Sequence, residues 1–235
     1  MNSIPSLSVF FPAYNEEKNI SSTVKKAVSI LKKIVKNYEI LIIDDGSSDK
    51  TAEVSKSLAK SNPRIKLIQH KPNKGYGAAL ISGLYNSKYE WIVFSDADGQ
   101  FDFSELPKLL EKQKSTRADL VIGQYINRKV SFIRKINTFC WQILIHFLFG
   151  LKVKDIDCGF KLISKKVLDK IPVLESQRGA FISTEFLVKA KLAGFKIVEQ
   201  PVHHYPRVQG KPTGADFKVI INSFKDLFKL RNKVR

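Results

Sequence analysis

Two aspartates separated by one residue follow an apolar run near the middle of this 235-residue chain. The run Trp91–Ser95 has the composition of a buried strand, and Asp96, Ala97 and Asp98 come directly after it. Carboxylates at positions i and i+2 of a turn can both bind one hard cation, and Gln100 offers a carbonyl oxygen to the same ion. A cation held by so few protein ligands keeps positions open for a diphosphate. The sequence therefore predicts a divalent cation at a nucleotide-diphosphate site, whereas an Asx turn is the alternative interpretation.

Polar clusters also end the two other apolar runs Leu7–Phe11 and Glu39–Ile43. After the first, Tyr14 can pack against a base and Glu16 can bind its edge. After the second, Asp45 can accept hydrogen bonds from a ribose or a base. Helix capping is the competing interpretation of both clusters: Asn15 within a capping box in the first, and Ser48 or Asp49 at a helix start in the second.

The elements that must position these residues alternate between strand and helix through residue 125. Apolar runs of strand length occupy 7–11, 39–43, 65–69, 91–95 and 120–122. Stretches of helical spacing lie between them at 17–36, 50–61, 75–86 and 104–114. Continuous apolar strands separated by helices predict an α/β fold with a mostly parallel sheet covered on both faces. Ligands of such sheets bind beyond the carboxyl ends of the strands, where the polar clusters lie.

The second half of the chain has a different pattern. Helices are predicted over Phe132–Leu151, Ala180–Ala193 and Asp216–Leu230, and a strand over Lys196–Pro201. The first helix is too short and too interrupted by polar residues to span a bilayer, and the last is amphipathic. We expect one domain over residues 1–235, in which 1–125 bind the nucleotide sugar and 126–235 bind the acceptor and a membrane surface.

The charge balance favours phosphate-bearing partners. The formal net charge is +18, and the basic excess is concentrated in the second half. Such a field attracts nucleotide diphosphates and anionic lipid headgroups, although a generally lysine-rich protein is the simpler interpretation. No nucleic-acid-binding motif is present. With two cysteines and no secretory signal, the sequence predicts a cytoplasmic protein in a reducing compartment. The sequence leaves the oligomeric state open.

Several further residues are candidates for the site. Arg134, Thr138 and Arg207 are candidate phosphate ligands, with Lys211 close to Arg207 in sequence. Glu185 lies in an apolar helix and is either a general base or a paired structural acid.

Other polar or small residues favour packing. Cys158 is interpreted as a small core residue, and the neighbours His203 and His204 as packing residues that point to opposite sides. The stretch 73–78 lacks the glycine spacing of a P-loop, so we expect small residues that let a helix start lie close to the sheet.

The motifs FFPAYNEEKNI, EILIIDDGSSDKT, NKGYGAAL, SDADGQFD, DCGFKLISKKVL and PVHHYPRVQGKPTG occur in this order over nearly the whole chain. Together they resemble glycosyltransferase family 2, and within it the polyprenyl-phosphate sugar synthases such as dolichyl-phosphate mannose synthase. The resemblance implies a GT-A fold and inverting transfer from a UDP- or GDP-linked sugar to a polyprenyl phosphate. Transfer to a glycan or protein hydroxyl, with Glu185 as base, is the alternative.

The resemblance also implies roles for individual residues. Around the nucleotide it places Pro12, Tyr14, Glu16, Ile43 and Asp45. With Mg²⁺ or Mn²⁺ and the diphosphate it places Asp96, Ala97, Asp98 and Gln100, and with donor or acceptor phosphate Arg134, Thr138, Arg207 and Lys211. Asp98, Glu185 and Arg207 are the expected catalytic residues, although a lipid phosphate is already anionic and Glu185 can then be an orienting group.

Two departures from the family pattern bear on these expectations. Gln124 and Tyr125 stand where an arginine often follows the Val-Ile-Gly strand, so a phosphate contact is missing or moved to Arg128. Asp157 adds a carboxylate in a stretch where Thr-Ser-Gly-Phe is common. Basic residues near anionic headgroups contribute roughly 1 kcal/mol each, so we expect peripheral attachment to the inner face of a membrane through the first and last predicted helices of this half.

Overall fold

The computed structural model describes residues 6–126, 132–206 and 217–234, without the side chains of 132–136 and 217–222. Within these residues, one seven-stranded sheet has the strand order β3-β2-β1-β4-β6-β5-β7. The strands are β1 (Ser6–Ala13), β2 (Asn37–Asp44), β3 (Ile65–Gln69), β4 (Trp91–Ser95), β5 (Leu120–Ile126), β6 (Phe160–Ser164) and β7 (Ile197–His203). The prediction of a mostly parallel sheet is confirmed, because only β6 runs antiparallel to its neighbours β4 and β5.

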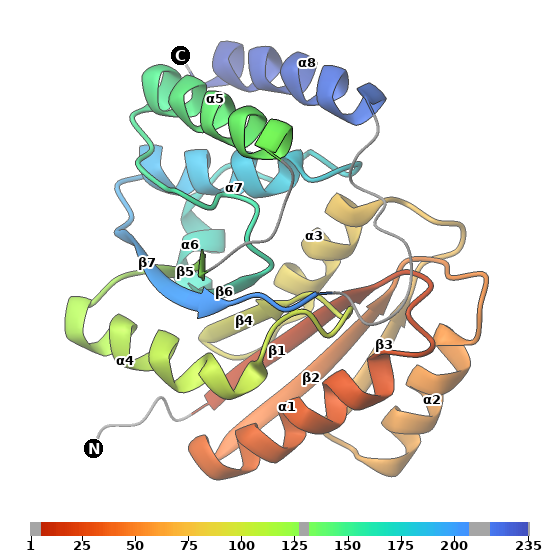
Figure 1. Ribbon diagram of the computed structural model, residues 1–235. Helices are drawn as coiled ribbons and strands as arrows, with labels where there is room; N and C mark the ends of the chain where they lie inside the picture. The colour runs from red at the N-terminus through yellow and green to blue at the C-terminus, as the bar shows by residue number, and fades with distance from the viewer. Residues whose placement is uncertain (1–5, 127–131, 207–216, 235) are drawn as a thin grey trace.

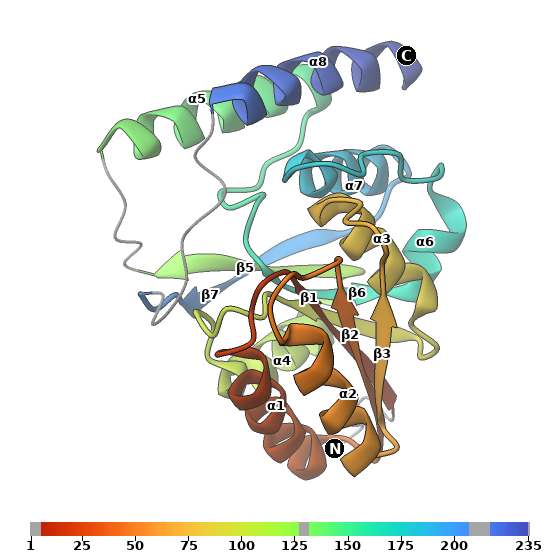
Figure 2. The same cartoon turned by 90° about the vertical axis from the view of Figure 1, so that its right-hand side faces the viewer.

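Helices cover both faces of this sheet (Figure 1). The helices are α1 (Ile20–Ile34), α2 (Thr51–Ser61), α3 (Tyr76–Asn86), α4 (Leu106–Thr116), α5 (Phe132–Phe149), α6 (Lys165–Lys170), α7 (Phe181–Leu192) and α8 (Phe217–Lys233), with a 3₁₀ turn at Phe103–Glu105. Figures 1 and 2 show α1, α2 and α4 on one face, α3, α6 and α7 on the other, and α5 beside α8 in an outer layer over α7.

Polar residues that precede α1 and α2 form hydrogen bonds outside these helices, and this affects where the helices begin. The spacing predicts a helix from residue 17, but α1 begins at Ile20, because the Glu16 carbonyl already accepts the backbone N–H groups of Asn19 and Ile20 in the preceding turn. The capping-box interpretation is wrong, since the side chain of Asn15 accepts hydrogen bonds from Ser48. Lys50, rather than the predicted Ser48 or Asp49, is the N-cap residue of α2, and Asp49 Oδ1 accepts the Thr51 N–H at 2.9 Å from one residue before it. The short helix α6 has no counterpart in the prediction.

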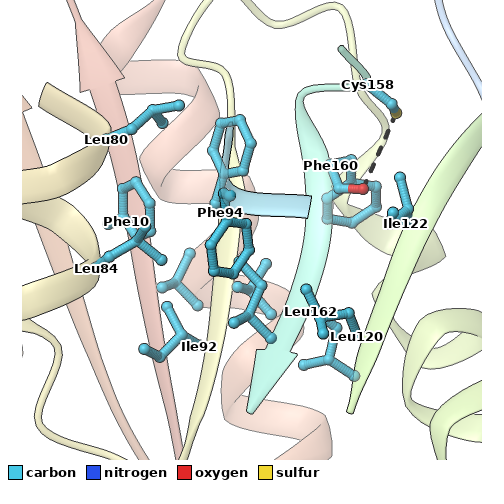
Figure 3. Close-up of a cluster of buried hydrophobic side chains, with 14 of the residues drawn as sticks. Phe10, Leu80, Leu84, Ile92, Phe94, Leu120, Ile122, Cys158, Phe160 and Leu162 are labelled. Carbon is cyan, nitrogen blue, oxygen red and sulfur yellow. Dashed lines mark hydrogen bonds between the residues drawn. The ribbon is translucent and has the colours of Figure 1, made fainter. Parts of the chain in front are cut away.

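The core fills both faces of the sheet, since its buried residues include those of α1 and α4 as well as α3. Figure 3 shows the part between the sheet and α3 that continues across β4, β6 and β5. Phe10 of β1 and Phe94 of β4 are buried and their rings stack with centroids 5.5 Å apart. Each buried ring contributes about 2–3 kcal/mol from apolar area alone. At Gly83 of α3 a Cβ atom would lie 2.2 Å from the Phe10 ring, so α3 approaches the sheet as closely as the small residues of its sequence predict.

Candidate active site

The carboxyl ends of β1, β2 and β4 lie at one edge of the sheet. In the parallel pairing of β1 with β2, Ala13 lies opposite Asp44, and the Asp45 N–H continues the ladder to the Ala13 carbonyl at 2.9 Å. Strand β4 pairs with the other side of β1. The residues predicted around a nucleotide and its metal, from Pro12 to Glu16, at Ile43 and Asp45, and from Asp96 to Gln100, therefore gather at this edge.

The loop after β1 is fastened to the loop after β2. Asn15 donates its N–H to Ser47 Oγ at 2.9 Å, and Glu16 donates its N–H to Thr51 Oγ1 at 2.8 Å. The Glu16 carboxylate accepts a hydrogen bond from Asn19 Nδ2 at 2.7 Å and is buried. Tyr14 remains 46% exposed at the rim, which suits a ring that stacks on a base.

Pro12 and Ile43 lie opposite each other in the β1–β2 pairing and are buried. Ala97 is buried too, and its carbonyl accepts a hydrogen bond from Thr23 Oγ1. The side chains of these three residues are therefore engaged in the interior, and their predicted nucleotide contacts remain predictions.

Asp45 holds together the loop that precedes α3. Its carboxylate accepts hydrogen bonds from His70 Nδ1 at 2.7 Å, Asn73 Nδ2 at 2.8 Å and the backbone N–H groups of Lys74 and Gly75 at 3.0 and 2.8 Å. Asp45 is 3% exposed. The structure thus gives Asp45 a positioning role, for which the sequence offered no signal, because its partners lie 25–30 residues further along the chain.

Asp96 is held from two sides. Its Oδ1 accepts a hydrogen bond from the hydroxyl of Tyr76 at 3.0 Å, and its N–H binds the Gly159 carbonyl at 3.0 Å. Because β6 is antiparallel to β4, its first residues lie beside the last residues of β4, and this brings the turn at 157–159 next to Asp96. A Cβ atom at Gly159 would lie 2.0 Å from Asp96 Oδ2. Sequence reasoning missed both Tyr76 and Gly159.

The electrostatics at Asp96 suit a bound cation. Burial and the nearby Asp98 raise the pKa of Asp96 to about 7. Asp98 Oδ1 accepts the N–H of Gln100 at 3.0 Å, which closes the turn that the sequence predicts. A divalent cation between the two carboxylates would offset both their desolvation and their mutual repulsion. The donor set therefore fits Mg²⁺ or Mn²⁺, the hard cations that oxygen ligands favour.

The metal would find few other protein ligands. Among the residues that the structure describes, no group of three or more histidine, cysteine or acidic side chains comes close enough to hold a metal ion. Gln100 donates its amide N–H to the Tyr205 carbonyl at 2.8 Å, so its side-chain oxygen is the atom that remains for the cation. The remaining positions would then be available to a diphosphate.

The end of β7 is joined to the same turn. Tyr205 donates its N–H to the Gln100 carbonyl at 2.8 Å, and His203 donates its N–H to Glu105 Oε2 at 2.7 Å. His204 packs as predicted, since its ring contacts Phe101 and Tyr125. His203 is exposed instead, and its Nδ1 lies 3.0 Å from Glu105 Oε1. Arg207 and Lys211 lie outside the described residues, and their predicted phosphate contacts stay predictions.

Glu185 of α7 is a paired acid. Its Oε1 accepts hydrogen bonds from Lys189 Nζ at 2.6 Å and the Glu175 N–H at 2.9 Å, and its Oε2 accepts the Ser176 N–H at 2.8 Å. Burial by itself would raise the pKa of Glu185, but the hydrogen bonds from Lys189 and Ser176 outweigh it and lower the pKa. The contacts match the orienting role, and the role of base remains a prediction.

The loop that Glu185 holds packs on the start of α3. Gln177 accepts the Ala78 N–H at 2.8 Å, and a Cβ atom at Gly77 would lie 1.9 Å from the Ser176 carbonyl oxygen. The stretch 73–78 is therefore fixed between Asp45 on one side and Ser176–Gln177 on the other. This confirms that small residues allow close packing at this helix start.

Thr138 lines a pocket between α5 and the turn before β6. The pocket is lined by Tyr125, Thr138, Trp141, Gln142, Asp155, Ile156 and Asp157. Asp155 Oδ2 accepts the Tyr125 N–H at 2.9 Å. Arg134 is part of α5, but its side chain lies outside the described part of the chain, and so does Arg128.

A buried lysine donates a hydrogen bond to the turn at 157–159. Lys161 is 2% exposed, donates to the Cys158 carbonyl and lies 5.1 Å from the centre of the Phe94 ring. Cys158 is fully buried, and burial raises the pKa of its thiol to about 12, which confirms a core residue rather than a nucleophile.

In the described residues, no helix has both the length and the apolar composition needed to cross a membrane. The outer helices nevertheless carry large exposed apolar side chains. We call these the α5–α8 apolar surface, and it consists of Phe139, Ile143, Phe147, Phe224 and Phe228. The two helices contact each other through the rings of Trp141 and Phe224, whose centroids lie 5.3 Å apart.

Curated relatives cover almost the whole chain. A dolichyl-phosphate beta-glucosyltransferase of Dictyostelium discoideum is 32% identical over 96% of this chain and 73% of its own length. The protein of the same name from Saccharomyces cerevisiae is 31% identical over 93% of this chain and 71% of its own length. A dodecaprenyl-phosphate galacturonate synthase of Rhizobium johnstonii is 26% identical over 97% of this chain and 68% of its own length.

Solved structures share the fold. Glucosyl-3-phosphoglycerate synthase from Mycobacterium tuberculosis in complex with UDP superposes with a TM-score of 0.70 at 17% identity, over 98% of this chain and 80% of that chain. Mannosyl-3-phosphoglycerate synthase from Rubrobacter xylanophilus gives a TM-score of 0.70 at 14% identity, over 97% of this chain and 75% of that chain. At this identity the likeness establishes the GT-A fold alone.

A protein-family model matches more than half of the chain. The matched residues are 8–172, from the first residues of β1 through the Asp96–Asp98 turn to the end of α6. These residues include the three strand ends at which the polar side chains gather. The chain is a glycosyltransferase and belongs to glycosyl transferase family 2.

Proposed function

We propose that this enzyme transfers a sugar from a nucleoside diphosphate, UDP or GDP, to a polyprenyl phosphate with inversion at the anomeric carbon. The observation that carries the proposal is the convergence of Tyr14, Asp45 and the Asp96–Asp98 pair at one edge of the sheet. Relatives at 31–32% identity over more than nine tenths of the chain are named for transfer to dolichyl phosphate, which supports the acceptor.

The donor would lie along this edge. In the proposal Tyr14 stacks on the base, and the backbone around Pro12, Ile43 and Ala97 lines the ribose and base. Asp96, Asp98 and Gln100 would hold Mg²⁺ or Mn²⁺, which would supply positive charge beside the departing diphosphate. Arg134, Thr138, Arg207 and Lys211 are proposed contacts of the donor or acceptor phosphates.

The acceptor phosphate requires little help from a base. One of its oxygens, already anionic, forms the new bond to the anomeric carbon while the bond from that carbon to the diphosphate oxygen breaks. The electron pair leaves with the nucleoside diphosphate, and no proton has to be removed from the nucleophile. This agrees with the pairing of Glu185 to Lys189, which leaves its carboxylate engaged in holding the 175–176 backbone.

The α5–α8 apolar surface supports a peripheral site at a membrane. Phe139, Ile143 and Phe147 are spaced by four residues on α5 and are 61%, 53% and 84% exposed. The exposed lysines Lys225 and Lys229 of α8 accompany them. An apolar helix face with adjacent basic residues matches an interfacial helix. We propose that this surface rests on anionic lipid where the polyprenyl phosphate is presented.

The experiment that tests the function is sugar transfer with UDP- and GDP-linked donors, with and without Mn²⁺ or Mg²⁺ and a short polyprenyl phosphate. Transfer that needs both the metal and the lipid phosphate is expected, and Asp98→Ala should remove at least two orders of magnitude of it. Asp169→Ala, an exposed carboxylate on α6, is the matched control and should retain full transfer. Donor turnover that ignores the lipid phosphate would support a glycan or protein hydroxyl acceptor instead.

A further inference from the structure

Tyr76 donates a hydrogen bond to a proposed metal ligand from a fixed position. It is the first residue of α3, directly after Gly75, whose N–H binds the Asp45 carboxylate at 2.8 Å. On the opposite side the next two residues of α3 are packed against the backbone of Ser176 and Gln177. The origin of the tyrosine side chain is thus held by contacts on two sides, before any ligand is present.

The hydroxyl of Tyr76 reaches one oxygen of Asp96. The donor–acceptor distance is 3.0 Å to Oδ1, and the other oxygen lies against the Cα of Gly159. In this contact the phenol hydroxyl is the donor and the carboxylate oxygen the acceptor. A carboxylate that is hydrogen-bonded at Oδ1 and closely packed at Oδ2 is restricted in its rotation.

We propose that Tyr76 is a positioning residue that fixes the Asp96 carboxylate in the orientation in which it binds the divalent cation. This inference rests on the proposed metal site. A ligand carboxylate that turns freely must lose rotational freedom when the metal binds, whereas one already held does not. Hydrogen-bond partners of metal ligands typically change metal affinity by about 10–100-fold when they are removed.

A packing role is the competing explanation for Tyr76. The substitution Tyr76→Phe separates the two roles, because it keeps the ring and removes only the hydroxyl. Tyr85→Phe is the matched control: Tyr85 lies near the other end of the same helix and is 44% exposed. Asp96→Asn supplies the reference in which the metal ligand itself is altered.

The test is Mn²⁺ binding, followed through the electron paramagnetic resonance signal of free Mn²⁺, with UDP or GDP present and no acceptor. Tyr76→Phe is expected to raise the apparent Kd for Mn²⁺ about tenfold, and Tyr85→Phe to leave it unchanged. In the Asp96→Asn background, Tyr76→Phe should have no further effect on the Kd. Thermal unfolding without metal should be the same for Tyr76→Phe and Tyr85→Phe within a few degrees.

Two results would overturn the inference, and they differ in what they say of the proposed function. If Tyr76→Phe binds Mn²⁺ as the wild type does while Asp96→Asn binds it weakly, the metal site stands and Tyr76 does not position it. If the wild type binds no Mn²⁺ with either nucleotide, the metal site and the role of Tyr76 fail together.

Discussion

At the scale of single residues, the proposed metal site depends on Asp96, whose carboxylate meets the Tyr76 hydroxyl and the turn at Gly159. The Asp96–Asp98 pair and the exposed ring of Tyr14 were identified from residue type and from their place after apolar runs. Asp45 was identified as a ligand, whereas the structure engages its carboxylate with a loop 25–30 residues away. Tyr76 and Gly159 were missed, since nothing local in the sequence shows that they meet Asp96.

The raised pKa of Asp96 predicts how metal binding responds to pH. A cation and a proton compete for this carboxylate, whose pKa is about 7. Mn²⁺ affinity should be constant above pH 8 and fall by up to about tenfold per pH unit below 7, since the ionised fraction of the Asp96 carboxylate shrinks by that factor. The measurement is the Kd for Mn²⁺ in the presence of the nucleoside diphosphate from pH 5.5 to 8.5. Equal affinities at pH 6 and pH 8 would contradict the assignment of Asp96.

Gly159 offers a substitution that should separate activity from stability. In Gly159→Ala the new methyl group would lie 2.0 Å from Asp96 Oδ2, so the carboxylate must turn away. Displacement of a ligand by about an ångström costs roughly 100-fold in rate, while a side-chain oxygen can move without unfolding the protein. We expect kcat/KM to fall about 100-fold with a change of only a few degrees in melting temperature. Full activity of this variant would show that the orientation of Asp96 is not critical.

At the scale of elements, periodicity predicted the strands and helices well but missed the direction of one strand. Strand β3 and strand β4 have the predicted bounds, and α2 and α3 begin one residue late. The antiparallel direction of β6 was not predicted, because a buried apolar strand has the same composition in either direction. Because β6 is antiparallel to β4, the turn at 157–159 lies next to Asp96. The contact of Gly159 with Asp96 was missed for the same reason that the direction of β6 was missed.

The buried pair of Glu185 and Lys189 makes a prediction about the stability of α7. Glu185→Gln should lower the free energy of unfolding by about 3 kcal/mol, because it leaves the Lys189 ammonium, 4% exposed, without its anion. The pKa of Glu185 is lowered, so its stabilisation is present above the ordinary carboxyl value near 4.5 and is lost as the pH falls through the lowered value. The difference from the wild type should therefore be full at pH 7 and shrink in strong acid.

Urea unfolding at pH 7 and at pH 3 measures this difference. Glu175→Gln is the control, because the pair of Glu175 with Lys233 is more than half exposed and should contribute less than about 1 kcal/mol. If Glu185→Gln unfolds like the wild type but loses sugar transfer, Glu185 acts in the chemistry and the orienting role is wrong.

At the scale of the whole molecule, the proposed contact with lipid rests on the uneven charge and on the outer helices. Figures 1 and 2 both place α5 beside α8 in the layer furthest from α1 and α2. The helices themselves were predicted from their apolar spacing. Their pairing through Trp141 and Phe224 was beyond the sequence, since about 80 residues and two strands separate them.

The α5–α8 apolar surface should determine binding to vesicles. Phe139→Ser combined with Phe147→Ser removes two exposed rings and should weaken co-sedimentation with anionic vesicles by at least tenfold, since each buried ring contributes about 1.5–3 kcal/mol. Binding by the wild type should decrease with salt because the lysines contribute. Tyr85→Ser, which removes an exposed ring from α3, should bind as the wild type does. Equal binding by all three proteins would exclude this surface as the lipid contact.

The most direct measurement compares a short polyprenyl phosphate with the corresponding polyprenol as acceptors, using one nucleoside-diphosphate sugar and Mn²⁺. We expect a glycosylated lipid phosphate of inverted anomeric configuration, detected by mass spectrometry and nuclear magnetic resonance, and no product from the alcohol. We also expect Asp98→Ala to give no product from either acceptor. Equal transfer to the polyprenol, or transfer that persists in Asp98→Ala, would contradict the proposed function.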